Sequence, residues 1–239
     1  AQTNEPAVQT QADLLAPYFT PIAQDSSVYD NPYRIALFSP KNGEDGARAW
    51  SQTKSVFAYG LVAFGILASL PESSTGWEKN TDFFNKWVEN VRDGPEWDRN
   101  KFAYNYIGHT YFGGVYYQVA RKSGYRQWDS FIYTFLMSTF YWEYGIEAFA
   151  EIPSIQDIVF TPIAGWIYGE WAYQTEIAIR ENGNEVMGSG ILGGASLILL
   201  DPVDGAGRAV NRIFGRRLVK AGYGYFTYNP AQTPDGQTD

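Results

Sequence analysis

Three helix-length segments follow one another in the middle of the chain, with very short breaks between them. They cover residues 98–122, 127–151 and 154–180, and the breaks fall at Gly124 and Pro153, residue types that end helices. Connections this short place consecutive helices side by side in opposite directions. The sequence therefore predicts an all-α protein organised around a central antiparallel three-helix set.

Further helices are expected on both sides of this set. Residues 48–70 are largely apolar and predict a buried central helix, while residues 80–91 have the amphipathic pattern of a helix on the surface of a bundle. An apolar, glycine-rich segment at 187–200 and a short basic helix at 206–219 follow the set. Together these segments predict a compact helical bundle of about six or seven helices.

The two ends of the chain differ from this bundle in composition. Residues 1–30 are polar and rich in Gln, Ala, Thr and Pro, which is typical of an irregular arm. With 239 residues, of which 45% are hydrophobic, the chain can bury one substantial core. We therefore predict an N-terminal arm at 1–30, one helical domain at 31–220 and an irregular C-terminal tail at 221–239.

Glycines recur four residues apart in two of the apolar segments. One pair is Gly165 and Gly169, and the other is Gly190 and Gly194. Glycines at this spacing lie on one helix face and let a neighbouring backbone approach closely. We expect a tight helix contact at each pair.

Aromatic residues make up 17% of the chain, with 8 Trp and 18 Tyr. Such rings gather where a protein meets the boundary of lipid and water, so contact with lipid or a membrane surface is one interpretation and an aromatic-rich core is the other. The net charge of −8 argues against a nucleic-acid partner and against attraction to anionic headgroups. Any membrane contact should therefore be apolar or neutral in character.

The chain contains no cysteine, which excludes disulfides, thiolate metal sites and a cysteine nucleophile. It starts Ala-Gln-Thr-Asn-Glu, a small residue followed by polar sequence. This pattern remains when a secretory signal is cut. We therefore expect an exported protein.

The single histidine, His109, lies in helical sequence crowded with aromatic residues. Asn105 is four residues before it and therefore on the same helix face. A histidine beside a carboxylate is the usual arrangement of a general base. The alternative is a core histidine held by hydrogen bonds.

Carboxylates recur every four residues along the second segment, at Glu143, Glu147 and Glu151. Their neighbours are mostly aromatic and aliphatic, so at least one of them should be buried and then protonated, hydrogen-bonded or paired. A surface stripe of acids near the end of the helix is the alternative.

Two more acids occur in the third segment. Asp157 follows Ser154 by three residues, as in a capping box, whereas Glu170 lies inside apolar helical sequence where capping does not explain it. We expect the three helices to gather these polar groups in their shared interior: Asn105, His109, Glu143, Glu147 and Glu170.

We expect no metal and no cofactor. His109 with Glu143, Glu147 and Glu170 would suit Zn, Mn or Fe, but di-iron sites in bundles take two Glu-x-x-His motifs, and one histidine cannot supply them. Neither a nucleotide-binding glycine motif nor a Gly-x-Ser-x-Gly elbow is present.

Several motifs appear in a fixed order along residues 95–215. They are Asn105-Tyr-Ile-Gly-His109, Trp142-Glu143-Tyr-x-x-Glu147, Glu151-x-Pro-Ser154-x-x-Asp157 and Thr161-Pro-x-x-Gly165-x-x-x-Gly169-Glu170. In these motifs the chain resembles the bacterial family catalogued as domain of unknown function 3943. The resemblance implies an exported protein of the Gram-negative envelope, in the periplasm or outer membrane, and supplies no activity. A weaker likeness connects Glu147, Asp157, Gly165 and Gly169 with VanZ-like membrane proteins, whose apolar helices are longer.

Three functions fit these observations. The first is a membrane-associated envelope protein that binds lipid or another envelope component, including a protein partner, through a polar cluster among aromatic helices. The second is a hydrolase or transferase acting on an envelope lipid or glycan, with His109, Glu143 and Glu147 as catalytic residues and Asn105, Glu151, Asp157 and Glu170 in binding. The third is a structural or partner-binding module whose polar core residues fix the helix register.

Overall fold

The computed structural model describes residues 35–40, 43–75, 82–97 and 103–222, and within these ranges every regular element is a helix. The predicted N-terminal arm, and the C-terminal tail beyond residue 222, lie outside the described residues. The all-α class that the sequence predicts is confirmed.

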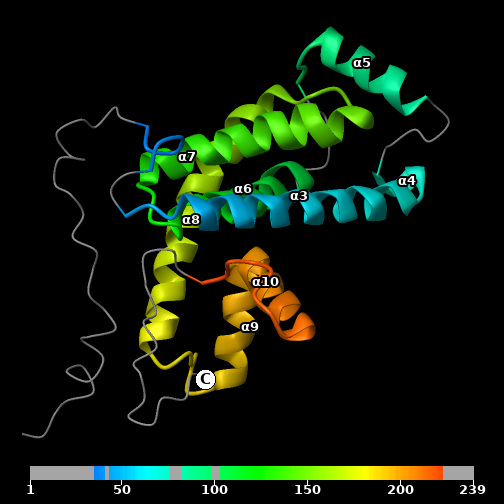
Figure 1. Cartoon of the computed structure of the whole chain (residues 1–239). Coiled ribbons are helices and arrows are strands. Elements are labelled where there is room, and N and C mark those ends of the chain that lie inside the picture. Colours follow the sequence, from blue (N-terminus) through cyan, green and yellow to red (C-terminus); the bar gives the residue numbers. More distant parts are fainter. Residues whose placement is uncertain (1–34, 41–42, 76–81, 98–102, 223–239) are drawn as a thin grey trace, which may run out of the picture.

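Figure 1 shows the helices in chain order. They are α3 (Gly46–Ser69), α4 (Glu72–Thr75), α5 (Phe83–Asp93), α6 (His109–Arg121), α7 (Gln127–Leu136), α8 (Ile155–Glu181), α9 (Gly190–Leu200) and α10 (Pro202–Phe214). Two π-helical segments, η2 (Ala103–Gly108) and η3 (Met137–Ile146), and a 3-10 turn, η4 (Glu147–Phe149), complete the described elements.

The centre of the fold is the set of α6, α7 and α8, as the short breaks in the sequence predict. Consecutive helices run in opposite directions, so α6 and α8 run in the same direction. His109 at the start of α6 contacts Thr161 near the start of α8, and Lys122 just after α6 binds Glu176 near the end of α8. This parallel pair carries most of the polar side chains considered below.

Glycines bring α6 and α8 into close contact. A Cβ atom built on Gly165 would lie 2.5 Å from the carbonyl carbon of Gly113, and one on Gly169 would lie 2.7 Å from the ring of Tyr117. The prediction of a tight contact at Gly165 and Gly169 is confirmed, because only a residue without a side chain fits there.

The corresponding prediction for α9 is wrong. Gly190 and Gly194 have nothing within 4 Å of an added Cβ, whereas the neighbouring Gly193 faces the carbonyl of Asn184 in the preceding loop. The spacing of four residues was present, but an added side chain at either glycine would meet open space.

The second predicted segment is not one regular helix. Its first ten residues form α7, after which the chain widens into η3 and then tightens into η4. A π-helical turn holds about one more residue than an α-helical turn, and such turns occur often at functional sites. The wider η2 likewise ends directly before His109.

The helix predicted at residues 48–70 forms as α3, but it is not buried along its length. Its buried residues lie between Arg48 and Val56, and Leu61, Val62 and Ile66 beyond them are exposed. The expectation of a buried central helix is therefore corrected, because the second half of α3 extends past the central set towards α4 (Figure 1).

The amphipathic helix predicted at residues 80–91 forms as α5. It packs on the turn that follows η3, where the rings of Phe84 and Trp87 both contact Phe149. The indole N–H of Trp87 also donates to the carbonyl of Tyr144 at 2.8 Å. These contacts hold α5 next to the segment that carries Glu143 and Glu147.

Candidate functional site

Three helices bring one imidazole and two buried carboxylates together. His109 is the first residue of α6, Glu143 lies in η3, and Asp157 lies in the first turn of α8. One nitrogen or oxygen atom from each of the three side chains lies within 4.8 Å of the other two. We call these three residues the His109 cluster.

A local hydrogen-bond exchange positions the two carboxylates. Ser154 caps α8, and its hydroxyl accepts a hydrogen bond from the backbone N–H of Asp157 at 3.1 Å. In a capping box, the Asp157 carboxylate would accept from the Ser154 N–H in return. Here Glu143 accepts from that N–H, at 3.0 Å, and the Asp157 carboxylate lies 3.7 Å from Nδ1 of His109 instead.

The imidazole is held by Thr161, which was not among the predicted site residues. Nδ1 of His109 lies 3.0 Å from Oγ1 of Thr161, one helical turn after Asp157 on the buried face of α8. The spacing of four from Asp157 was visible in the sequence. Without the parallel pairing of α6 and α8, however, nothing connected Thr161 to the histidine.

Glu147 lies one turn beyond Glu143, next to the cluster. Burial raises the pKa of its carboxyl well above the ordinary value, and the charges of Glu143, Glu151 and Asp157 act in the same direction. Its Oε2 atom is buried and has no hydrogen-bond partner among the described residues. Burial beside other acids therefore favours the neutral form of Glu147, unless a cation binds nearby.

Two further predicted residues lie at the margin of the cluster. Glu151 is partly exposed and acts on Glu147 through its charge. Asn105 belongs to η2, one turn before His109, and its side chain lies outside what the structure describes.

Glu170 is not part of the His109 cluster. It lies 13 residues after Asp157, about 20 Å further along α8 at 1.5 Å per residue. Its carboxylate accepts hydrogen bonds from Arg121 at 2.9 Å and from Tyr117 at 2.6 Å. Burial alone would raise the pKa of Glu170, but these hydrogen bonds lower it below the ordinary value. The expectation that Glu170 joins His109 is corrected, because Arg121 provides its own ion pair.

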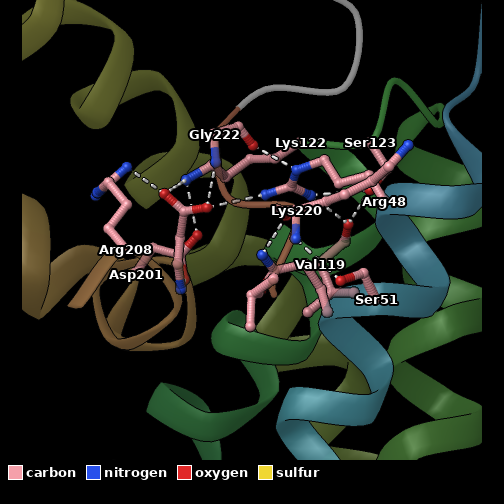
Figure 2. Close-up of polar contacts among 12 residues, drawn as sticks. Arg48, Ser51, Val119, Lys122, Ser123, Asp201, Arg208, Lys220 and Gly222 are labelled. Atoms are coloured by element: carbon pink, nitrogen blue, oxygen red, sulfur yellow. Dashed lines mark hydrogen bonds and ion pairs between the residues drawn. The ribbon is translucent and has the colours of Figure 1, made fainter. Parts of the chain in front are cut away.

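A second buried polar group was not predicted, and Figure 2 shows it. Lys122 is fully buried and donates to Glu176 at 2.9 Å and to Asp201 at 2.8 Å. Arg48 of α3 binds Ser123 at 2.9 Å and reaches the carboxylate of Asp204 at 3.4 Å. The group therefore joins α3, α6, α8 and the start of α10.

Asp204 is the centre of this group. It accepts from the backbone N–H of Gly222 at 2.6 Å and also binds Arg208. Burial alone would raise its pKa, but the charges of Lys122, Arg208 and Arg48 lower the pKa of Asp204 to about 2. Because its acids and bases bind one another, we assign this group to stability rather than chemistry.

The two polar groups have different chemical capacities. In the Asp204 group, every acid named above has a cationic partner. The His109 cluster combines an imidazole with two buried carboxylates and adjoins Glu147, so its donors suit proton transfer or the binding of a cation.

The fold and this site define an all-α protein with a histidine–carboxylate cluster at the junction of three helices. Residues 94–203 match the family model described as "Domain of unknown function (DUF3943)". The resemblance that the motifs predict is thus confirmed for residues 94–203, and all three residues of the cluster lie within this range.

The remaining comparisons add no further relative. No curated protein and no solved structure matches the chain. The weaker likeness to VanZ-like proteins is not supported. Among the helices that the structure describes, none is both long enough and apolar enough to cross a membrane.

Proposed function

We propose that this protein binds lipid at a membrane surface through the outward face of α8. The observation that carries this proposal is that α8 is apolar on the face turned away from α6. Four apolar residues lie along that face at a spacing of four: Val159, Ile163, Ile167 and Trp171. Ile167 and Trp171 are 66% and 57% exposed. Contiguous exposed apolar surface marks a site of contact with a membrane or a partner.

Aromatic residues favour lipid over a protein partner. Trp166 and Trp128, both exposed, lie on either side of Phe131 between α8 and α7. The indole N–H of Trp166 also binds the side-chain oxygen of Gln127 at 3.1 Å. Rings that combine an apolar body with a polar edge suit the boundary between headgroups and acyl chains.

An apolar hollow supports the same proposal. It has a volume of about 300 Å³ and lies between α3, α5 and the turn after η3. Five apolar side chains line it: Leu61, Phe64, Phe83, Ile146 and Phe149. A hollow of this chemistry fits part of an acyl chain, and Ile146 is the neighbour of Glu147.

The membrane that we propose is that of a bacterial envelope, in the periplasm or at the outer membrane. This location rests on the expectations from the sequence, and fractionation of a bacterium that carries the gene would test it. An envelope protein that covers the same face is the alternative partner.

Flotation with phosphatidylcholine vesicles tests the lipid proposal. The full chain should rise with the vesicles, and the double substitution of Ile167→Ser with Trp171→Ser should lower the vesicle-bound to free ratio at least about tenfold, since each side chain loses apolar burial. Both residues are exposed, so the fold should be retained.

A matched double substitution is available on α10. Ile213 and Phe214 are also exposed and apolar, but they belong to α10 and not to the α8 face. Ile213→Ser with Phe214→Ser should float like the unchanged chain. If the unchanged chain stays with the aqueous fraction, or if both double variants lose binding equally, lipid binding by the α8 face is refuted.

A second candidate function is a hydrolase or transferase. It is favoured by the His109 cluster, because a histidine within reach of two buried carboxylates can act as a base. We propose an envelope lipid or glycan as its substrate. His109→Gln should abolish turnover of such a substrate while leaving vesicle binding unchanged, which separates the two functions.

A further inference from the structure

We propose that the His109 cluster is a binding site for one divalent transition-metal cation, held by His109, Glu143 and Asp157. This inference goes beyond lipid binding and does not depend on it. The three side chains come from three different helices, so a bound ion would connect η3 and the starts of α6 and α8.

The positions of the candidate ligand atoms fit one ion. Two ligand atoms of one ion lie at most twice the metal–ligand distance apart, roughly 4–5 Å for distances of about 2.0–2.5 Å. The candidate atoms of the cluster all lie within 4.8 Å of one another. Small side-chain adjustments would therefore bring all three to one ion.

The ligands of the cluster are also largely buried. The Glu143 and Asp157 side chains are almost fully buried, at 1% and 3% exposure, and only 16% of the His109 side chain is exposed. Gathering carboxylates away from water is costly unless a positive charge accompanies them. A divalent cation supplies that charge.

Glu147 is a further buried acid beside the cluster. Its Oε2 atom has no hydrogen-bond partner among the described residues, and the Trp142 side chain hydrogen-bonds the carboxyl. Glu147 is not among the side chains whose ligand atoms lie within 4.8 Å of one another, so it is a neighbour of the site and not one of its ligands. A cation at the cluster would stabilise the charged form of this neighbouring acid.

The surroundings also hold the ligands in place. The Ser154 N–H fixes one oxygen of Glu143 at 3.0 Å. Hydrogen bonds of this kind orient metal ligands and strengthen binding. The Thr161 hydroxyl lies 3.0 Å from Nδ1 of His109, so it orients the ring when Nε2 is the ligand atom and gives way to the ion when Nδ1 is. Ser154 caps α8 and Thr161 lies in its second turn, so one helix supports both contacts.

The ligand types indicate which cation binds. Imidazole nitrogen suits Zn²⁺ and the later transition metals, and carboxylate oxygen is accepted by Zn²⁺ and Mn²⁺ alike. One imidazole among carboxylates therefore favours Zn²⁺ or Mn²⁺ over Mg²⁺ and Ca²⁺, which prefer oxygen alone. The paired Glu-x-x-His motifs that the sequence lacks belong to di-iron sites, whereas a site for a single ion needs only one histidine.

The single histidine makes a direct experiment feasible. The full chain, labelled with ¹⁵N-histidine and purified without a polyhistidine tag, contains one imidazole and no cysteine. After treatment with EDTA, Zn²⁺ should bind in a 1:1 ratio by titration calorimetry and should shift the imidazole nitrogen resonances. Mg²⁺ at the same concentration should leave them in place.

Substitutions then assign the carboxylates. Glu143→Gln and Asp157→Asn keep an acceptor oxygen, so the cap of α8 can persist. Each should weaken Zn²⁺ binding by at least the roughly 10- to 100-fold that loss of an outer hydrogen-bond partner causes. Glu181→Gln, at the exposed end of α8, is the matched control and should bind Zn²⁺ as the unchanged chain does.

Each outcome decides the proposal. Binding that shifts the imidazole and is weakened by the two substitutions supports it. No binding of Zn²⁺ or Mn²⁺, or binding that leaves the imidazole resonances unchanged, overturns it. Should a carboxylate variant fail to fold, the imidazole signal of the unchanged chain still gives the answer.

Discussion

The carboxylate of Glu143 occupies the position that Asp157 would take in a capping box. The two residues share Ser154, because its backbone N–H binds Glu143 while its hydroxyl accepts from the N–H of Asp157. As a result, α8 is capped and Asp157 still lies beside His109. Stability of the helix start and formation of the cluster therefore depend on the same few atoms.

Glu147 gives a prediction about stability at neutral pH. A carboxyl whose pKa is higher in the folded chain than in the unfolded one destabilises the fold as pH rises above the unfolded value, 4.5 for Glu. In EDTA, Glu147→Gln should therefore raise the unfolding temperature at pH 7. Calorimetric scans from pH 4 to pH 8 should show this advantage growing with pH and vanishing near pH 4. An equal advantage at every pH would contradict the raised pKa of Glu147 as its cause.

The ionised form of Asp204 stabilises the fold, in contrast to that of Glu147. Its pKa is lowered to about 2 in the folded chain, so it stabilises the fold above about pH 4, and this stabilisation is lost as pH falls towards 2. Asp204→Asn should cost about 3–5 kcal/mol at pH 7, because it leaves buried cations without their partner. Urea unfolding at pH 7 and pH 3 should show a smaller difference between the two chains at the lower pH.

How far single residues can be predicted depends on where their partners lie in the sequence. His109 and Glu143 stand out because each is ionisable within apolar sequence. Asp157 was explained by its capping pattern, whereas Glu143, which accepts from the Ser154 N–H in its place, lies eleven residues before Ser154. Glu170 looked like a buried acid, because its partner Arg121 is on another helix. Local patterns cannot reveal such distant partners.

At the scale of elements, the parallel contact of α6 with α8 sets the geometry of the site. Gly113 and Gly165 let the two backbones meet, and this places the starts of both helices together. His109 and Asp157 are then neighbours although they are 48 residues apart. A wider spacing of the helices would separate the imidazole from the carboxylate.

A glycine comparison tests the importance of this contact. Gly165→Ala puts a methyl group 2.5 Å from the backbone of Gly113, so it should destabilise the fold by about 1–3 kcal/mol. Gly194→Ala, inside α9 with nothing within 4 Å, should instead stabilise it by up to about 1 kcal/mol. Urea unfolding of the two variants beside the unchanged chain measures both effects, and equal changes would refute the close-contact explanation.

The positions of the helices could be predicted well from the sequence, because glycines, prolines and capping residues act locally. The burial of whole helices could not be predicted in this way. The apolar pattern of α3 continues past Val56, yet Leu61 and Ile66 in its second half are more than half exposed. Apolar sequence predicts that a surface will be covered, but it does not name what covers it.

At the scale of the whole molecule, charge and apolar surface act in opposite directions. The net charge of −8 repels anionic membranes, whereas the α8 face attracts apolar material. The proposed binding should therefore be stronger to phosphatidylcholine than to phosphatidylglycerol vesicles at low salt. Added salt should reduce this difference by screening the repulsion. Flotation at about 0.01 M and 0.15 M ionic strength measures it, and stronger binding to the anionic vesicles would contradict the apolar mechanism.

The π-helical segment η3 makes the number of residues in this region matter as much as their identity. Deleting one residue of η3 before Glu143, such as Thr139, without a matching change in its turns would rotate everything after it by about 100° relative to α7. Glu143 would then point away from Ser154 and His109. We therefore expect related chains that keep the cluster to tolerate substitutions between Met137 and Ser154 but neither insertions nor deletions.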